Sequence, residues 1–171
     1  MKNKQDLVFL GGLFLFLLIL FFMARPGSRV PERGFHGVAL PSVSSGATTS
    51  LDACSTPKCL TVYVAPWCKI CRNSTGVIAA LSRYLKQHGV QTRIVVGNGS
   101  PDEVKDYAQQ IGPDTLMDTG DKVPVSGGVP NFIVSDGKGQ ILESIPGVPG
   151  MYQPPYSEDV LKEFADYLHL P

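Results

Sequence analysis

The cysteines at positions 68 and 71 are the residues of this sequence best suited to chemistry. Cys68 and Cys71 are separated by Lys69 and Ile70, and Trp67 comes directly before them. Two cysteines at this spacing can close into a disulfide and reopen, so the pair can hold two electrons and pass them on. The thiolate is the attacking species in that exchange, so the local electrostatic field decides how reactive the pair is.

The flanking sequence predicts a strand before the cysteine pair and a helix after it. Residues 60–65 begin with an apolar run typical of a strand buried on both faces. Beyond Cys71, apolar residues recur at helical spacing until Gly89, a residue type common just past a helix end. A helix N-terminus carries unpaired N–H groups and roughly half a positive charge. A cysteine pair in the first turn of this helix therefore lies in a field that favours the thiolate.

The rest of the sequence predicts three more strands and two more helices. A strand is expected at residues 90–96, and Ser100, Pro101 and Glu103 then form a helix start with a capping box. Further on, the patterns indicate strands at 131–135 and 140–145 and a last helix starting near residue 157. The predicted order is β-α-β-α-β-β-α. The first two strands, joined through a helix, should be parallel, and the last two should form a hairpin.

This order of elements, with Trp-Cys-x-x-Cys after the first strand and a Val-Pro before the third, resembles the thioredoxin-like superfamily over residues 58–170. The resemblance implies an α/β thioredoxin-like fold and thiol–disulfide exchange that needs no cofactor. It implies that Cys68 is the attacking thiolate and that Cys71 resolves the mixed disulfide. It also implies that Pro130 is a cis-proline against the pair, that Val129 offers backbone groups to an extended substrate, and that Trp67 lies beside the thiols.

Two features depart from thioredoxins proper. Those proteins carry a buried acid six residues before the first cysteine, whereas this chain has Val62 there. No carboxylate at that position can take the proton from Cys71. Between the cysteines, Lys69 and Ile70 stand where thioredoxins have Gly-Pro, and an exposed Lys69 should favour the thiolate only modestly. The direction of electron flow does not follow from these residues.

A second pair, Cys54 and Cys59, comes just before the first strand. We expect a structural disulfide closed through the intervening Thr-Pro turn, worth about 2 kcal/mol. A second redox pair that relays electrons, or a pair of free thiols, are the alternatives. A zinc site built from all four cysteines is disfavoured, because a strand at about 3.3 Å per residue separates Cys59 from Cys68.

The first 52 residues differ in composition from the rest of the chain. Residues 7–24 are apolar and uncharged and are expected to form a transmembrane anchor behind a short cytoplasmic segment, residues 1–6. A cleaved signal peptide is the competing interpretation, although a Phe at the −3 position of a site ending at Ala24 fits small-residue cleavage poorly. Residues 25–52 are rich in Pro, Gly, Ser and Thr and are expected to be a flexible linker to a domain at 53–171. The alternative is that part of this segment packs on the domain through Phe35, Val38 and Leu40.

The location and partners follow from the cysteines and the apolar run. Disulfides persist in oxidising compartments, so we expect a single-pass protein of the bacterial inner membrane whose domain faces the periplasm or the cell exterior. Its expected partners are protein disulfides or dithiols, a membrane redox partner and the bilayer at residues 7–24. A formal net charge of +0 gives no indication of nucleic-acid binding. The competing hypothesis is a non-catalytic anchored binding or assembly module in which Cys68–Cys71 is a permanent disulfide.

Overall fold

The computed structural model describes residues 34–150 and 152–171. The predicted cytoplasmic segment at 1–6, the predicted anchor at 7–24 and the start of the predicted linker lie outside the described residues. Within the part that is described, no helix is both long and apolar enough to cross a membrane.

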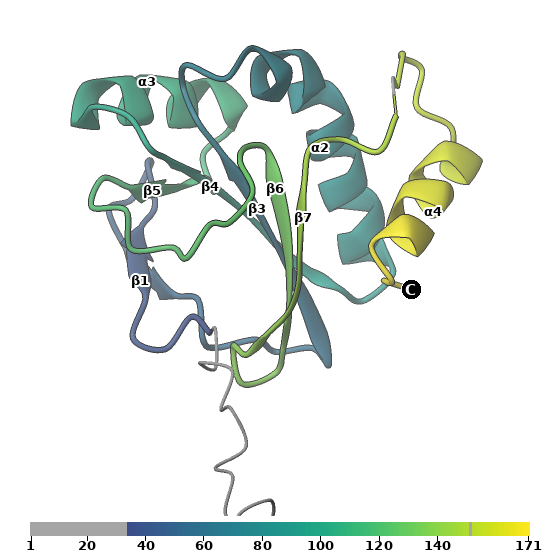
Figure 1. Ribbon diagram of the computed structural model, residues 1–171, viewed down its shortest axis with the longest axis horizontal. Helices are drawn as coiled ribbons and strands as arrows, with labels where there is room; N and C mark the ends of the chain where they lie inside the picture. The colour runs from purple at the N-terminus through teal and green to yellow at the C-terminus, as the bar shows by residue number, and fades with distance from the viewer. Residues whose placement is uncertain (1–33, 151) are drawn as a thin grey trace, which may run out of the picture. The chain divides into compact units, whose positions relative to one another are not determined.

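A five-stranded sheet in the order β5-β4-β3-β6-β7 forms the centre of the molecule (Figure 1). The middle strand, β3 (Lys58–Val64), pairs in parallel with β4 (Gln91–Gly97) and antiparallel with β6 (Asn131–Asp136). At the edges lie β5 (Leu116–Asp118), parallel to β4, and β7 (Ile141–Pro146), antiparallel to β6. The predicted parallel pair and the predicted hairpin are therefore confirmed.

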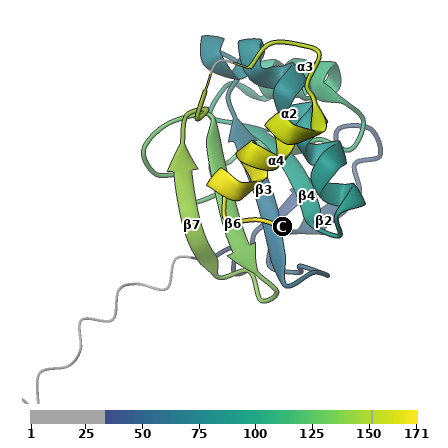
Figure 2. The ribbon, with the colours of Figure 1, turned by 90° about the vertical axis from the view of Figure 1, so that its right-hand side faces the viewer.

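Three helices pack with this sheet. They are α2 (Lys69–Gln87), α3 (Pro101–Ile111) and α4 (Glu158–Tyr167). Figure 2 shows α2 and α4 together in front of the sheet, and the two helices are in contact. Ser100 caps α3 in the predicted capping box with Glu103. These elements confirm the expected α/β thioredoxin-like order, although β5 was not predicted.

The two faces of β3 belong to two different hydrophobic clusters. Leu60, Val62 and Val64 point into the larger cluster, which includes buried residues of all three helices. Tyr63 points into a smaller cluster on the other face. This alternation is the ordinary period-two geometry of a strand, and it explains why the run is apolar at nearly every position.

The smaller cluster corrects the predicted linker. Residues 34–52 are folded and contain a hairpin of β1 (Ala39–Pro41) and β2 (Thr48–Ser50). Side chains from this segment are buried beside β3, β4 and β6; they are Phe35, Val38, Leu40 and Leu51. The prediction of a flexible linker is wrong for residues 34–52, because these apolar side chains cover the sheet face that Tyr63 occupies. The alternative that Phe35, Val38 and Leu40 pack on the domain is confirmed.

Candidate active site

The turn between β3 and α2 places the sulfur of Cys68 at the helix N-terminus. Cys68 is the N-cap residue of α2, and its Sγ accepts a hydrogen bond from the backbone N–H of Cys71 at 3.0 Å. Its own N–H donates to the carbonyl of Ala65 at 3.1 Å, which closes the turn. The first turn of α2 contains no acidic residue. The sulfur therefore occupies the position where a helix stabilises negative charge.

Cys68 and Cys71 are joined by a disulfide, with their Cα atoms 5.2 Å apart. Cys71 is fully buried in the larger cluster, whereas Cys68 keeps 5% of its surface exposed. Any partner that reaches this disulfide must therefore approach from the side of Cys68.

The loop before β6 faces the disulfide. The carbonyl oxygen of Val129 lies 3.5 Å from Cys68 Sγ, and the peptide bond between Val129 and Pro130 is cis. Pro130 is buried, while Val129 is partly exposed. The structure thus brings Trp67, Cys68, Val129 and Pro130 to one end of the sheet, whereas Lys69 and Ile70 lie on the exposed first turn of α2.

Asn131 holds this loop in place, a role that sequence reasoning missed. It is fully buried, and its Nδ2 donates to the carbonyls of Ser126 at 2.6 Å and Gly128 at 3.3 Å. Its Oδ1 accepts from the Ser144 hydroxyl at 2.9 Å. The side chain therefore ties the loop to β6 and β7. The only available signal was a polar residue at the first position of an otherwise apolar strand.

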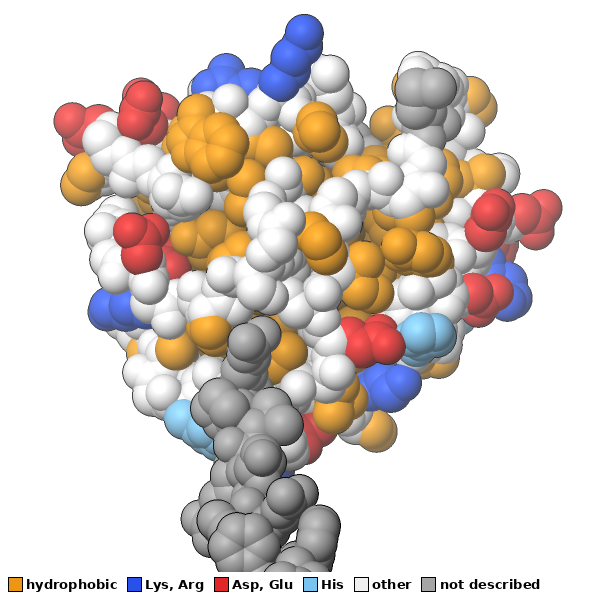
Figure 3. All heavy atoms as spheres, viewed as in Figure 1, with side chains coloured by type: hydrophobic (Ala, Val, Ile, Leu, Met, Phe, Trp, Pro, Cys, Tyr) orange, Lys and Arg blue, Asp and Glu red, His pale blue; other side chains and the backbone are white. Residues whose placement is uncertain are grey.

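Two exposed apolar side chains, Trp67 and Ile70, form a rim beside Cys68. Trp67 is 62% exposed and Ile70 is 57% exposed, and Figure 3 shows hydrophobic side chains gathered over the upper part of this face. The indole of Trp67 is nevertheless fixed, because its Nε1 donates to the carbonyl of Asn98 at 2.6 Å. Adjacent exposed apolar side chains of this size, one of them held by a hydrogen bond, offer a partner protein a surface to bury.

A groove of about 430 Å³ opens beside this rim. Trp67 and Val129 form part of its wall, and the loop after β5 forms another part through Asp121, Val123 and Pro124. That loop is organised by the buried carboxylate of Asp118, which accepts from the N–H groups of Lys122 at 2.9 Å and Val123 at 3.0 Å. Asp118 is the second positioning residue that the sequence did not reveal.

Tyr63 lines the same groove. Its hydroxyl lies 3.5 Å from Oδ2 of Asp118, and burial, followed by the charges of Asp118 and Asp121, raises the pKa of Tyr63 far above its usual value. The phenol therefore remains a neutral donor. Gly97 is required beside it, because a Cβ at that position would collide with the Tyr63 hydroxyl.

Arg72 adds a fixed positive charge next to the cysteines. Its Nε donates to the carbonyl of Pro66 at 2.7 Å, and its guanidinium lies 5.6 Å from the centre of the Tyr107 ring. Position 62, where thioredoxins have a buried acid, is occupied by Val62. This side chain is buried among apolar residues. Asp118 is the only buried carboxylate in the described part of the chain, and its hydrogen-bond partners are Tyr63, Lys122 and Val123 rather than a cysteine.

The second cysteine pair lies at the other end of β3. Cys54 and Cys59 form the expected disulfide, with Cα atoms 6.0 Å apart. The turn between them is held by Thr56, whose hydroxyl donates to the Lys58 carbonyl at 2.6 Å and accepts from the N–H of Gln91 at 3.2 Å. All four cysteines of the chain are thus paired in two separate disulfides.

The comparisons with known proteins identify the fold. No protein-family model and no curated protein matches the sequence. Solved structures do match. A thiol:disulfide interchange protein DsbE from Chlorobium tepidum is 19% identical, with a TM-score of 0.56 over 76% of this chain and 92% of that chain.

Two further solved structures show the same similarity. The thioredoxin domain of a thiol-disulfide oxidoreductase from Bacteroides vulgatus is 13% identical, with a TM-score of 0.53 over 76% of this chain and 91% of that one. The exposed lipoprotein thioredoxin of Streptococcus pneumoniae is 22% identical, with a TM-score of 0.51 over 73% of this chain and 97% of that one. The fold of the chain is therefore thioredoxin-like, and it extends over nearly the whole of these proteins.

Proposed function

We propose that this protein is a membrane-anchored thiol–disulfide oxidoreductase that reduces, oxidises or isomerises disulfides of envelope proteins through Cys68 and Cys71. One observation carries the proposal: Cys68 is the N-cap of α2, and the N–H of Cys71 points at its sulfur from 3.0 Å. After reduction, the same N–H and the helix N-terminus stabilise a thiolate at this sulfur. A sulfur stabilised in this way is an effective nucleophile and an effective leaving group.

In the reducing direction, the Cys68 thiolate attacks one sulfur of a substrate disulfide. A mixed disulfide forms between Cys68 and the substrate, and the second substrate sulfur leaves as a thiolate. Cys71 then attacks Cys68 Sγ, which releases the substrate as a dithiol and leaves the Cys68–Cys71 disulfide. Two electrons pass from the protein to the substrate, and a membrane dithiol donor must restore them. The oxidising direction reverses each step.

The residues around the pair have roles in this proposal. Trp67 and Ile70 provide apolar contact with the substrate protein, and the backbone of Val129 pairs with an extended substrate segment beside Cys68. Pro130 supports this loop from the core. Lys69 and Arg72 add positive charge that favours the Cys68 thiolate.

We also propose a location. Residues 7–24 anchor the chain in a bacterial inner membrane, with residues 1–6 on the cytoplasmic side and the domain in the periplasm or outside the cell. The uncharged apolar run supports the anchor, and the two disulfides support an oxidising compartment. The anchor would hold the domain near a membrane redox partner.

Trapping of mixed disulfides tests the assignment. Cys71→Ser leaves Cys68 able to attack but removes the resolving thiol, so this variant should accumulate mixed disulfides with client proteins on non-reducing gels. Cys68→Ser should accumulate none, and a Cys54→Ser/Cys59→Ser variant should behave like the wild type. Equal trapping by the Cys68 and Cys71 variants would contradict the assigned roles.

A second function is favoured by one observation, the 5% exposure of Cys68. In that case the domain is a non-catalytic binding or assembly module, and Cys68–Cys71 is a permanent disulfide. The redox potential of this pair distinguishes the two functions. Structural disulfides lie below about −300 mV, and exchange-active ones lie higher. Equilibration with glutathione, read by mass spectrometry of alkylated Cys68, measures it.

A further inference from the structure

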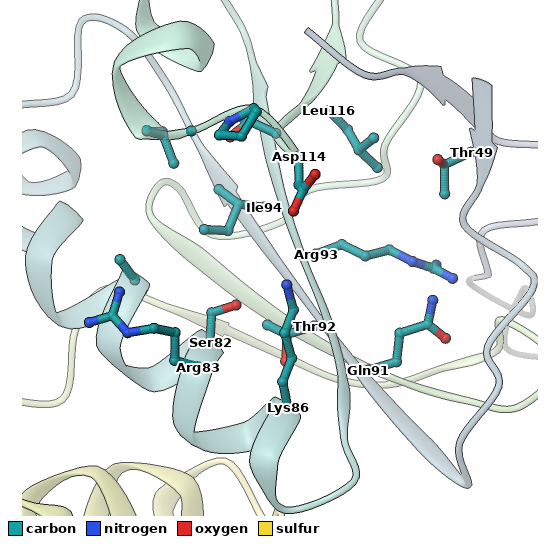
Figure 4. A pocket seen from close by; sticks show the side chains of 15 residues that line it. Thr49, Ser82, Arg83, Lys86, Gln91, Thr92, Arg93, Ile94, Asp114 and Leu116 are labelled. Atoms are coloured by element: carbon teal, nitrogen blue, oxygen red, sulfur yellow. The ribbon is translucent and has the colours of Figure 1, made fainter. Parts of the chain in front are cut away.

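A cavity of about 330 Å³ lies away from the redox pair, between the C-terminal half of α2, β4 and the segment after α3 (Figure 4). Polar residues on its wall include Ser82, Lys86, Gln91, Arg93 and Asp114. The 11 residues from Cys71 to Ser82 span about 16 Å of helix, so this cavity is separate from the cysteine pair.

The charge on the cavity wall is positive. Arg83, Lys86 and Arg93 line it, against the single carboxylate of Asp114. None of these four residues forms an ion pair with another described residue, since the salt bridges found there are Lys162–Asp166 and His169–Glu143. Two positive charges of the wall are therefore left uncompensated by the lining itself.

Gln91 is oriented so that it offers hydrogen-bond donors to the cavity. Its Oε1 accepts from the backbone N–H of Ser55 at 2.8 Å and from the Ser55 hydroxyl at 3.0 Å. Those two bonds fix which way the amide faces. In Figure 4 the amide nitrogen points toward the guanidinium of Arg93, and no described residue accepts a hydrogen bond from it. These two donor groups cannot bond to each other, so an acceptor that enters the cavity here would meet both.

Two mostly buried polar side chains also line the wall. Arg93 is 8% exposed, and its guanidinium is held by the carbonyls of Leu51 at 3.0 Å and of Ala53, while its Nε has no acceptor. Ser82 is also 8% exposed; its hydroxyl projects from α2 into the cavity and forms no hydrogen bond with a described residue. The Arg93 Nε has almost no accessible surface, so of these two groups only the Ser82 hydroxyl can bond to a ligand in the cavity.

The rest of the wall is apolar. Ile94, Ile111, Pro113 and Leu116 contribute to it, together with Ala79 of α2. A fully hydrated ion would gain nothing from these side chains, whereas a compact hydrocarbon body would bury surface against them. The ligand therefore needs an anionic group at one end and an apolar body at the other.

We propose that this cavity binds a small organic oxyanion, with its carboxylate, sulfonate or phosphate group held by Lys86, Ser82 and the Gln91 amide and its apolar body packed on Ile94 and Leu116. Charge-assisted hydrogen bonds from the ammonium supply most of the affinity. The fixed charge of Arg93 adds long-range attraction. This site is independent of the proposed redox function.

A titration observed by ¹H–¹⁵N NMR tests the site with phenyl phosphate as the probe and the full oxidised protein. The side-chain amide signal of Gln91 and the backbone amides of Ser82 and Lys86 should shift saturably. Lys86→Met should weaken binding at least about tenfold, because it removes the charged donor. Gln91→Glu should abolish binding, because it keeps the acceptor for Ser55 but replaces the donor with a negative charge. Lys105→Met, on the exposed surface of α3, is the matched control and should bind like the wild type.

Three results would overturn this proposal. The first is no saturable shift at these residues. The second is equal binding by Lys86→Met and Lys105→Met in proteins whose other signals are unchanged. The third is equal affinity for benzyl alcohol, which keeps the ring without the charge. Equal affinity for inorganic phosphate and phenyl phosphate would contradict the proposed apolar body of the ligand. Insulin reduction by the same variants should stay at the wild-type rate, so failure of this site leaves the redox proposal intact.

Discussion

The two disulfides of this protein are close in sequence spacing and opposite in setting. Cys68–Cys71 caps a helix, and its outer sulfur receives an N–H and lies 3.5 Å from a backbone carbonyl. Cys54–Cys59 closes a turn at the start of β3, where Thr56 and Gln91 hold the backbone. The groups around Cys68 can stabilise a negative charge on its sulfur. The groups around Cys54–Cys59 hold the backbone of a turn in place. Spacing alone would not separate the two roles.

The largest expected effect comes from removing each pair in turn. Cys68→Ser/Cys71→Ser should lower the rate of insulin reduction with dithiothreitol by at least about 100-fold, because no thiolate remains at the helix tip. Cys54→Ser/Cys59→Ser should keep the rate within about twofold but lower the free energy of unfolding by about 2 kcal/mol. Insulin turbidity and urea denaturation measure the two quantities. A loss of exchange in the second variant would instead indicate an electron relay between the pairs.

A smaller effect compares the two ends of β6. Asn131 lies beside the loop that faces Cys68, whereas Ser135 pairs with Cys59 across the strands and has a buried hydroxyl without a partner. Asn131→Ala should lower the free energy of unfolding by about 1–3 kcal/mol, because it leaves the carbonyls of Ser126 and Gly128 without a hydrogen-bond donor. The same variant should slow thiol–disulfide exchange. Ser135→Ala, the matched control, should change stability by less than about 0.5 kcal/mol. Equal losses in the two variants would remove the positioning role of Asn131.

The smallest effect concerns the groove beside Cys68 at alkaline pH. Burial first, and then Asp118 and Asp121, raise the pKa of Tyr63 above its unfolded value of about 10. Its contribution to stability is therefore complete below pH 10 and is lost as the pH rises toward the folded pKa. In that range the wild type should lose up to about 1.4 kcal/mol per pH unit more than Tyr63→Phe.

Tyr167→Phe is the control for this pH dependence, because Tyr167 is 49% exposed. Its alkaline stability profile, measured by urea denaturation at fixed pH values, should follow that of the wild type. Identical slopes for the wild type and Tyr63→Phe would show that the Tyr63 phenol ionises as readily in the folded protein as in the unfolded chain.

Sequence patterns predicted most of the sheet and the three helices of the described residues, 34–150 and 152–171, because their signals are local. The apolar run at β3 and the capping box at Ser100 both mark elements long enough to carry a period. The three-residue strands β1, β2 and β5 are too short for that. The folded segment at 34–52 was also obscured by its Gly, Ser and Thr content. Its few apolar side chains are stabilised only by the second face of a sheet formed elsewhere in the chain.

In the candidate site, too, the residues in local motifs could be predicted and the residues that act through tertiary contacts could not. Cys68, Cys71 and Pro130 belong to short motifs, so their positions could be predicted. Asn131 and Asp118 act by reaching backbone groups of loops that only the tertiary structure brings near them. A buried Asn at a strand start and an Asp in an acidic stretch look the same in a sequence whether or not they organise a loop.

The hairpin before β3 also limits where this protein can be shortened. A fragment that starts at residue 53, the domain edge predicted from composition, would leave Tyr63, Val95 and Ile133 facing water. An apolar face of that kind promotes self-association and precipitation during purification. Recombinant versions intended for crystallisation should therefore retain the chain from Gly34 onward.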